Sequence, residues 1–325
     1  MKAIVFTKYG PPDVLQFKEV EKPTPKANEV LIRVQAATVT AGDCEIRDFR
    51  IPILFWLFAR IIFGLTGPRR PILGQELAGE IEAVGTDVKR LKVGDQVFAT
   101  TGVGLGAYAE YNCLPEGRAV AIKPTNMTFE EAATVPTGGL NALHFLRKAN
   151  IQSGEKVLIN GASGSIGAYA VQLAKHVGAE VTGVDSAEKL GMLREIGADQ
   201  VIDYTQEDFT KSGETYDVIF DVAAKSSYSR SAGSLKRDGR YISTTPGLSQ
   251  MVRGLWTSMT SRKKVTTGLA SEGTKNLVFL KELIEAGKIR SVIDRSYPLE
   301  QTAEAHKYVE KGLKKGNVVI TVGND

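Results

Sequence analysis

Hydrophobic and polar residues follow different patterns in the two parts of the chain. Up to residue 124, short apolar runs alternate with polar residues and are separated by Gly, Pro and charged turns, which is typical of β-strands. From residue 125 onward, strand-like runs alternate with stretches in which apolar residues recur every three or four positions. This alternation predicts βαβ units and a parallel sheet. The strands expected in the first part are residues 2–6, 14–20, 29–39, 76–85, 97–100 and 106–114.

The second part contains enough strands for a complete nucleotide-binding sheet. A capping box marks its first helix, because Thr128 is followed three residues later by Glu131. Six strands are the number in a full dinucleotide-binding sheet. After residue 271 the pattern predicts a helix, a strand, a second helix and a last strand. The six expected strands are residues 156–160, 179–184, 199–204, 216–222, 239–244 and 264–270.

The turn after residues 156–160 carries the clearest chemical signal. It reads GASGSIG, a variant of the GxGxxG pattern with Ala162 at the first glycine position. Gly164 lets a pyrophosphate approach the backbone, and Gly167 lets the next helix pack closely on the strand. The helix N-terminus offers N–H groups and a partial positive charge to the phosphates. The predicted phosphate-binding residues are Ala162, Ser163, Gly164, Ser165, Ile166 and Gly167.

The helix and strand after this turn strengthen the interpretation as a dinucleotide site. Asp185 closes the next strand 18 residues after Gly167, near the offset of roughly 20 at which an acidic residue meets the adenosine ribose. Asp185 alone favours NADH, whereas the hydroxyl of Ser186 and the ammonium of Lys189 suit a 2′-phosphate. These residues leave both cofactors open. The helix should face the sheet with one apolar stripe, made of Ile166, Tyr169, Ala170, Leu173, Ala174 and Val177.

Composition and charge narrow the class of protein. A chain of 325 residues with 42% hydrophobic and 24% charged residues is expected to form two globular domains. The net charge of +4 gives no basis for a nucleic-acid partner. Two cysteines without a CxxC pair, and a first segment that does not look like a signal peptide, favour the cytoplasm.

Residues 51–65 form an unusually apolar segment that is predicted to be a helix. At this length it would span about 22 Å, short of the roughly 30 Å of a bilayer core, and Arg60 lies in its middle. An integral membrane protein is therefore not expected, while peripheral attachment stays open. One stripe should pack on the first domain with Arg60 on the polar side; its members are Leu54, Leu57, Phe58, Ile61, Ile62 and Leu65, and Phe55, Trp56, Ala59 and Phe63 form a second apolar flank.

Four segments in order along the chain resemble the medium-chain dehydrogenase/reductases, in their zinc-independent quinone oxidoreductase and enone reductase branch. They read LGQELAGEIEAVG, KVGDQVFA, GASGSIGAYAVQLAK and GADQVIDYTQEDF. The resemblance implies an α/β protein with a GroES-like β-rich catalytic domain, residues 1–124 with 272–325. It also implies a Rossmann domain, residues 125–271, with a doubly wound parallel six-stranded sheet. Relatives pair through the edge of this sheet, so a homodimer through residues 265–270 is expected.

The resemblance also predicts that the protein holds no zinc. Where zinc alcohol dehydrogenases of this family have a cysteine and a histidine as ligands, this chain has Thr40 and Gln75. A hydroxyl and a neutral amide are poor zinc ligands beside thiolate and imidazole. The three histidines of the chain are expected on the surface or in helix packing; they are His144, His176 and His306.

Three residues are candidates near the nicotinamide and the substrate by this resemblance: Thr40, Asp43 and Tyr108. Asp43 can equally be a structural hydrogen-bond acceptor, and Tyr108 can be a packed strand residue. Tyr204 and Lys189 match residues near the adenosine phosphate of relatives, which favours NADPH and leaves NADH possible.

Together these features predict a metal-free oxidoreductase that transfers hydride from NADPH to an apolar α,β-unsaturated ketone or aldehyde, or to a quinone. Hydrogen bonds can stabilise the enolate or phenolate that forms. Phe55 and Trp56 are interpreted as one wall of the substrate pocket, with core packing as the other interpretation. The alternatives are a metal-free reductase or dehydrogenase of another carbonyl or alcohol, and a non-catalytic NAD(P)H-binding sensor.

Overall fold

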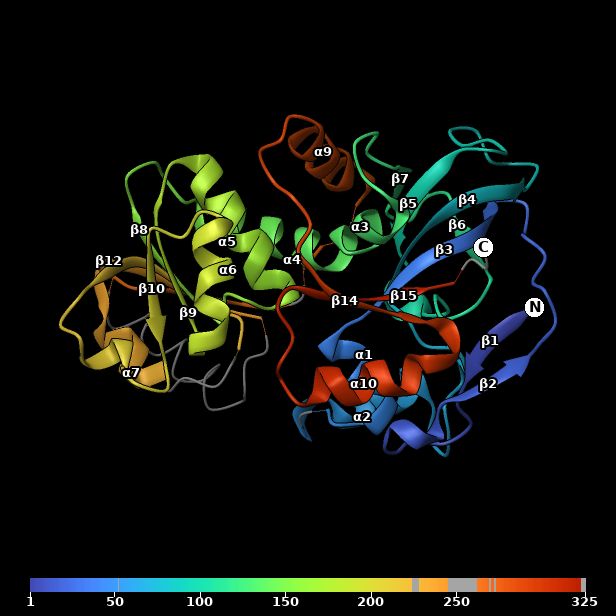
Figure 1. Cartoon of the computed structure of the whole chain (residues 1–325), viewed down its shortest axis with the longest axis horizontal. Coiled ribbons are helices and arrows are strands. Elements are labelled where there is room, and N and C mark those ends of the chain that lie inside the picture. The colour runs from blue at the N-terminus through green and yellow to red at the C-terminus, as the bar shows by residue number, and fades with distance from the viewer. Residues whose placement is uncertain (52, 224–227, 245–261, 269, 272, 323–325) are drawn as a thin grey trace. The chain divides into compact units, whose positions relative to one another are not determined.

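The computed structural model describes all residues except 52, 224–227, 245–261, 269, 272 and 323–325, and it leaves the side chains of 53–55 undescribed (Figure 1). The chain forms two compact units. Unit 1 comprises Met1–Thr137, Glu272–Gly287 and Ser291–Asp325, and unit 2 comprises Gly138–Ser271 and Lys288–Arg290. The boundaries at residues 124 and 271 remain our proposal for the domains; they assign residues 125–137 to the second domain.

Unit 1 is built on a seven-stranded sheet in which the end of the chain returns to its beginning. Strand β15 pairs antiparallel with β3, with Thr38 opposite Val319. The strand order is β14-β15-β3-β4-β5-β7, and β6 also pairs with β3. The strands are β3 (Glu29–Val39), β4 (Glu76–Val84), β5 (Gln96–Thr100), β6 (Tyr111–Pro115), β7 (Val120–Ile122), β14 (Ile293–Pro298) and β15 (Asn317–Thr321), beside a separate hairpin of β1 (Lys2–Val5) and β2 (Gln16–Glu19).

Some of the helices of unit 1 pack with this sheet around its main apolar core. The core takes Ile32, Leu77 and Val97 from three neighbouring strands and Ala305 from a helix. Thr128 caps α3 through the predicted box with Glu131. The helices are α1 (Ala41–Asp48), α2 (Ile53–Phe63), α3 (Phe129–Ala133), α9 (Thr274–Glu285) and α10 (Thr302–Glu310), with short 3-10 turns η1 (Pro12–Val14), η2 (Gly102–Gly104) and η5 (Leu299–Gln301).

Unit 2 is a parallel sheet of six strands, as predicted. Its order, β10-β9-β8-β11-β12-β13, is that of a doubly wound dinucleotide-binding fold, so the predicted fold class is confirmed. The strands are β8 (Lys156–Asn160), β9 (Glu180–Asp185), β10 (Gln200–Asp203), β11 (Tyr216–Asp221), β12 (Leu235–Ser243) and β13 (Lys264–Thr267). The helices are α4 (Val135–Ala149), which begins in unit 1, α5 (Ser165–Val177), α6 (Leu190–Glu195) and α7 (Tyr228–Gly233), with η3 (Ala187–Lys189) and η4 (Phe209–Lys211).

Helix α5 packs on the sheet with the central part of its predicted stripe. Tyr169, Ala170, Leu173 and Ala174 are buried, whereas Val177 is exposed in the last turn. Gly178 ends the helix in a left-handed conformation with φ of 91°. The helix that follows the Gly-rich turn is therefore fixed against the sheet along its middle turns.

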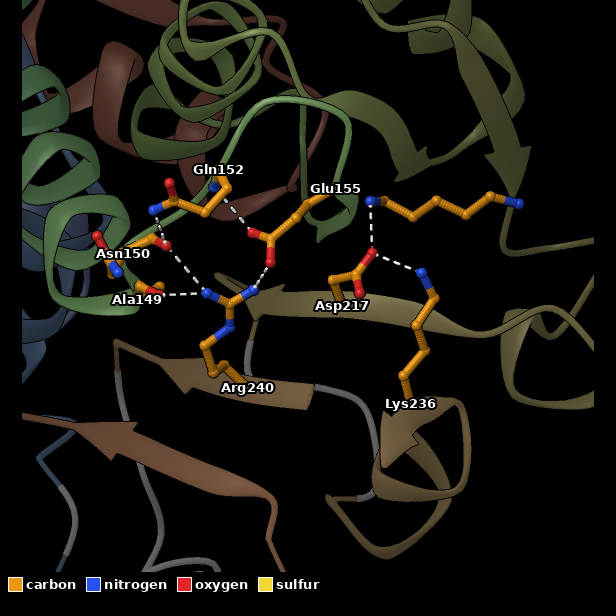
Figure 2. A network of polar contacts seen from close by, with 8 residues as sticks. Ala149, Asn150, Gln152, Glu155, Asp217, Lys236 and Arg240 are labelled. Carbon is orange, nitrogen blue, oxygen red and sulfur yellow. Dashed lines mark hydrogen bonds and ion pairs between the residues drawn. The ribbon is translucent and has the colours of Figure 1, made fainter. Parts of the chain in front are cut away.

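The C-terminal end of α4 is fastened to the sheet by Arg240 of β12 (Figure 2). Its Nη1 donates to the carbonyl oxygens of Ala149 at 2.8 Å and Asn150 at 3.0 Å, and its Nη2 pairs with Glu155. These carbonyls have no partner within the helix, so the guanidinium satisfies them and complements the helix dipole.

A second group in Figure 2 joins the starts of three strands through Asp217 of β11. Its Oδ2 accepts the backbone N–H of Lys156 at 2.8 Å and lies 2.7 Å from Nζ of Lys236. Polar contacts thus hold the amino ends of β8, β11 and β12 together. In doubly wound folds ligands bind at the opposite, carboxyl end of the strands.

Helix α2 is oriented opposite to the prediction. Leu57, Phe58, Ile61 and Leu65, which were expected to pack inward, are 63%, 65%, 53% and 61% exposed. Part of the predicted second apolar flank faces inward instead, together with Arg60, and Phe63 of that flank packs against the core of unit 1. Ala59 on that side is buried.

The reason lies in Arg60, whose guanidinium stacks on aromatic rings. Its Cζ lies 3.9 Å from the ring centre of Phe49, 4.9 Å from that of Tyr9 and 5.0 Å from that of Trp56. Its Nη1 also donates to the carbonyl oxygen of Leu65 at 3.2 Å. Cation–π contact makes an arginine compatible with an inward face, which apolar periodicity alone does not reveal. None of the helices in the described residues is both long and apolar enough to cross a membrane.

Candidate active site and cofactor-binding residues

The Gly-rich turn of unit 2 has the close packing that the motif requires. A Cβ at Gly167 would lie 2.3 Å from the carbonyl oxygen of Gly161 and 2.7 Å from backbone atoms of Ala162, so only glycine fits there. A Cβ at Gly164 would have no neighbour nearer than 3.6 Å. The turn is therefore tight on its inner side and open at the position where a pyrophosphate would approach the backbone.

The first turn of α5 adds a positive dipole end to this opening. Gly164 is the N-cap, and no acidic residue lies in the first turn. The amides at the start of a helix have no carbonyl partner within it, and they attract anions. Ser165 and Ile166 begin the helix there. The predicted phosphate-binding residues therefore lie together at one helix N-terminus.

Asp185 is saturated by donors from its own chain. Its Oδ2 accepts the backbone N–H of Ser163 at 3.1 Å and the Ser163 hydroxyl at 2.6 Å. Its Oδ1 accepts the backbone N–H of Ser186 at 3.0 Å and lies 3.2 Å from Nζ of Lys189. A carboxylate has about four acceptor positions, and these contacts take all of them. Asp185 therefore holds the Gly-rich turn and Lys189 in place.

The other predicted cofactor residues gather around the ends of β9 and β10. Asp203 lies opposite Asp185 in the sheet, and the backbone N–H of Tyr204 donates to the carbonyl oxygen of Asp185 at 3.1 Å. The side chain of Tyr204 is exposed, while Lys189 is buried beside Asp185. The structure thus brings Asp185, Ser186, Lys189 and Tyr204 to the carboxyl edge of the sheet, where doubly wound folds bind ligands.

Thr40 and Asp43 of unit 1 form a buried capping box at the start of α1. The Thr40 hydroxyl accepts the Asp43 N–H at 3.1 Å and donates to Oδ2 of Asp43 at 2.6 Å. Oδ1 of Asp43 accepts the N–H of Gly74 at 3.2 Å. Asp43 thereby joins α1 to the loop before β4. Burial raises the pKa of Asp43 to about 6.

Two further residues define the surroundings of this box. Gln75 is half-buried, and its Nε2 donates to the Thr40 hydroxyl at 3.3 Å. Tyr108 is fully buried and donates its hydroxyl to the carbonyl oxygen of Thr38 at 3.1 Å. Burial raises the pKa of Tyr108 well above its ordinary value, so its hydroxyl stays protonated. Thr40, Asp43 and Tyr108 therefore lie in one part of unit 1, with Tyr108 closed off from solvent.

Glu76 is a functional candidate that sequence reasoning missed. It is fully buried at the start of β4; the Thr38 hydroxyl donates to its Oε1, and the Thr137 N–H donates to its Oε2 at 2.6 Å. Burial raises its pKa to about 7. The available signal was an acidic residue inside an otherwise apolar strand, LGQELAG. Glu76 links β3, β4 and the first turn of α4 through one carboxylate.

Two of the three histidines, His306 and His144, make contacts within the fold, and His176 lies on the surface. His306 of α10 is buried, and its Nδ1 lies 3.1 Å from Nη1 of Arg47 in α1. Burial, with the charge of Arg47, lowers the pKa of His306 to about 3, so its neutral ring accepts this bond. His176 is exposed, and His144 lies 3.2 Å from the Ser271 hydroxyl. Within the described residues no group of three or more His, Cys, Asp or Glu side chains could hold a metal ion.

Comparison with known proteins places this architecture in a family. A family model described as Alcohol dehydrogenase GroES-like domain matches residues 26–125. The quinone-oxidoreductase homolog of chloroplasts from Spinacia oleracea is 33% identical, over 98% of each chain. The chain belongs to the medium-chain dehydrogenase/reductase family. It lies among the quinone oxidoreductases and enone reductases, as the sequence resemblance predicted.

Other members of the medium-chain dehydrogenase/reductase family agree in sequence and fold. The NADPH-dependent alkenal/one oxidoreductase of Arabidopsis thaliana chloroplasts is 30% identical, over 98% of this chain and 79% of its own. The quinone oxidoreductase of Coxiella burnetii superposes with a TM-score of 0.87 at 29% identity, over 99% of both chains. A second family model, described as Zinc-binding dehydrogenase, matches residues 196–320, which do not include Thr40 or Gln75.

We predict that Glu76→Gln removes part of the pH dependence of stability. The folded state raises the pKa of Glu76 from 4.5 to about 7, so folding favours the neutral carboxyl. The stabilisation of the folded state by the neutral carboxyl is fully present below pH 4.5 and is lost as the pH rises through 7. Between those limits the wild-type free energy of unfolding should fall relative to the variant by up to about 3 kcal/mol.

Urea unfolding at several pH values measures this difference. Glu80→Gln is the control, because Glu80 lies on the same strand but is partly exposed and paired with Arg33. The free energy of unfolding of this control should change with pH in parallel with that of the wild type. Parallel pH profiles for Glu76→Gln and the wild type would contradict the prediction.

Proposed function

We propose that the protein transfers hydride from NADPH to an apolar α,β-unsaturated carbonyl compound or quinone, without a metal. The observation that carries this proposal is the open Gly-rich turn at the N-terminus of α5, beside an Asp185 whose acceptor positions are filled. Relatives named quinone oxidoreductase and alkenal/one oxidoreductase support the substrate class. A bound nicotinamide supplies the hydride, and this chain holds and orients the two reactants.

The preference for NADPH rests on the contacts of Asp185. A carboxylate that binds ribose hydroxyls needs free acceptor positions, and here Ser163, Ser186 and Lys189 occupy them. Lys189 also offsets the negative charge that would repel a 2′-phosphate. The exposed ring of Tyr204 and the hydroxyl of Ser186 complete a phosphate-compatible edge.

The metal-free reaction rests on the chemistry of Thr40 and Gln75. Their hydroxyl and amide are hydrogen-bonding groups with little affinity for zinc. In conjugate reduction the negative charge develops on the substrate oxygen, where the second N–H of the Gln75 amide can stabilise it, because the Thr40 hydroxyl donates to Asp43 and accepts from Gln75. Asp43 and Tyr108 act as positioning residues in this proposal, because Asp43 orients the Thr40 hydroxyl and Tyr108 is bonded to Thr38. The enolate formed by hydride addition then takes a proton from solvent.

The substrate pocket is proposed to include Trp56. Its ring packs edge to face on Phe49 at 6.1 Å, and Phe49 is the C-cap of α1, the helix that begins at the Thr40 cap. Phe55 was proposed with it and its side chain lies outside the described residues. An aromatic wall beside α1 suits an apolar substrate.

The proposal also covers assembly and location. Strand β13 lies at the edge of the six-stranded sheet and pairs only with β12 among the described residues. Edge strands carry backbone groups able to extend a sheet across a two-fold axis. We therefore propose a homodimer through β13, located in the cytoplasm, where Cys44 and Cys113 stay reduced.

NADPH oxidation with a panel of quinones, ring enones, short enals and simple ketones tests the activity. Turnover is expected with quinones and enones, at a rate that a strong chelator leaves unchanged. Loss of activity on chelation would overturn the metal-free mechanism. NADPH binding without turnover of any acceptor would favour the sensor, and turnover of simple ketones alone would favour the reductase of another carbonyl.

Lys189→Ala should lower kcat/KM for NADPH by about tenfold and leave that for NADH nearly unchanged, since one charge-assisted contact to a phosphate is lost. Lys211→Ala removes an exposed lysine of the same unit and serves as the matched control. Steady-state kinetics with both cofactors gives the ratio of kcat/KM for NADPH to kcat/KM for NADH in each variant. Equal losses with NADPH and NADH would indicate that Lys189 only supports the fold through Asp185.

Trp56→Ala should raise KM for bulky apolar quinones by about tenfold and change KM for small enals little, because a large apolar contact is removed. Phe58→Ala, on the exposed side of the same helix, is the control and should leave both values unchanged. KM values for a series of acceptors of increasing size are the measurement. An equal rise for small and bulky acceptors would argue against a pocket role.

A further inference from the structure

Helix α2 carries an apolar surface that the described part of the chain leaves uncovered. Leu57, Phe58, Ile61 and Leu65 make up this surface, which we call the α2 face. Single exposed apolar residues are common on soluble proteins. Leu57, Phe58 and Ile61 are neighbours on one helical stripe, and Leu65 follows just after the helix ends at Phe63. Together they form a patch of the kind that marks an interaction site.

The orientation of the α2 face is held by contacts on the opposite side of the helix. Arg60 stacks on Phe49 and Tyr9, and Phe63 packs against the core of unit 1. Turning the α2 face inward would remove the guanidinium from these rings and expose Phe63. The outward apolar face is therefore a fixed feature of the fold.

Positive charge accompanies the α2 face. Between residues 49 and 75 the chain has four arginines and no acidic residue. Arg60 lies on aromatic rings and Arg50 pairs with Asp48 and Glu310, so Arg69 and Arg70, both exposed, supply the uncompensated charge. Among the described residues neither forms an ion pair, although Nη1 of Arg70 donates to the carbonyl oxygen of Val103 at 2.7 Å.

Lys8 adds a third exposed cation to the same region. The N–H of Phe6 donates to the carbonyl oxygen of Pro71 at 2.8 Å, which aligns the segment before Lys8 with the segment after Arg70. Lys8 is exposed and, within the ranges that the structure describes, makes no ion pair. The apolar stripe is thus followed by a group of three cations.

We propose that the α2 face, with Lys8, Arg69 and Arg70, docks on the surface of an anionic lipid bilayer. A short helix of this kind lies in the membrane plane, with its apolar side among the upper acyl chains and its cations at the headgroups. The eleven residues of α2 span about 16 Å, too short to cross the bilayer. A second copy of the chain fits less well, because a two-fold contact centred on this face would bring like charges together.

Co-sedimentation of the full chain with vesicles tests the proposal. The protein should sediment with vesicles of phosphatidylcholine that contain phosphatidylglycerol, at least tenfold more than with pure phosphatidylcholine, and high salt should weaken binding. Replacing Leu57, Phe58 and Ile61 together by Ser should abolish sedimentation. Arg69→Glu with Arg70→Glu should reduce it at least tenfold.

Matched variants separate docking from general effects. Val93→Ser and Lys92→Glu change an exposed apolar and an exposed charged residue in the hairpin between β4 and β5, and binding should not change. NADPH-dependent reduction of a water-soluble quinone should proceed at the same rate in the wild type and the triple Ser variant. This readout shows that the variant is folded and keeps the docking test separate from the proposed activity.

Three results would overturn the proposal. The first is that the wild type stays in the supernatant with both vesicle types. The second is that it binds neutral and anionic vesicles equally, and the third is that both the control and the α2 variants lose binding. A change from dimer to monomer in the triple Ser variant by light scattering, without vesicle binding by the wild type, would identify a second copy as the occupant. If the triple variant does not fold, loss of binding in the double Arg variant decides the question.

Discussion

Buried carboxylates fix the geometry of both candidate sites. Asp43, Glu76 and Asp185 are almost fully removed from water, and a carboxylate in that setting is tolerated only when hydrogen-bond donors surround it. In each case backbone N–H groups from neighbouring segments are among the donors. Satisfying one carboxylate therefore sets the positions of two or more loops at once. The Gly-rich turn, the start of α1 and the first turn of α4 all depend on this constraint.

Two arginines of unit 1, the buried Arg47 and the half-buried Arg60, play a corresponding role. Arg47 is held by the carbonyl oxygen of Gly10, by Glu310 and by the neutral ring of His306. Arg60 is held mainly by aromatic faces. A guanidinium is planar and weakly hydrated, so it can stack where a carboxylate could not. The first arrangement locks α10 to α1, and the second sets which side of α2 faces water.

Sequence patterns predicted the elements whose partners are local or periodic. The six-stranded parallel sheet, the Thr128 capping box and the tight contact at Gly167 follow from spacing alone. The orientation of α2 could not be predicted in this way. A helical wheel counts Arg60 as polar, and it does not contain the rings of Tyr9 and Phe49, which come from other segments. Glu76 was missed for the same reason, since its donors lie far away along the chain.

The opposing signals for the cofactor are reconciled by the contact between Asp185 and Lys189. The sequence contains an acid that favours NADH and a lysine that favours NADPH. The two side chains lie 3.2 Å apart, and this pairing weakens the preference that each would have alone. The acid loses its free acceptor positions, so its advantage for ribose hydroxyls falls. The lysine shares its charge with the acid, so a 2′-phosphate must compete for it. Because the two effects oppose each other, the proposed preference for NADPH should be moderate, set by the acceptor positions more than by net charge.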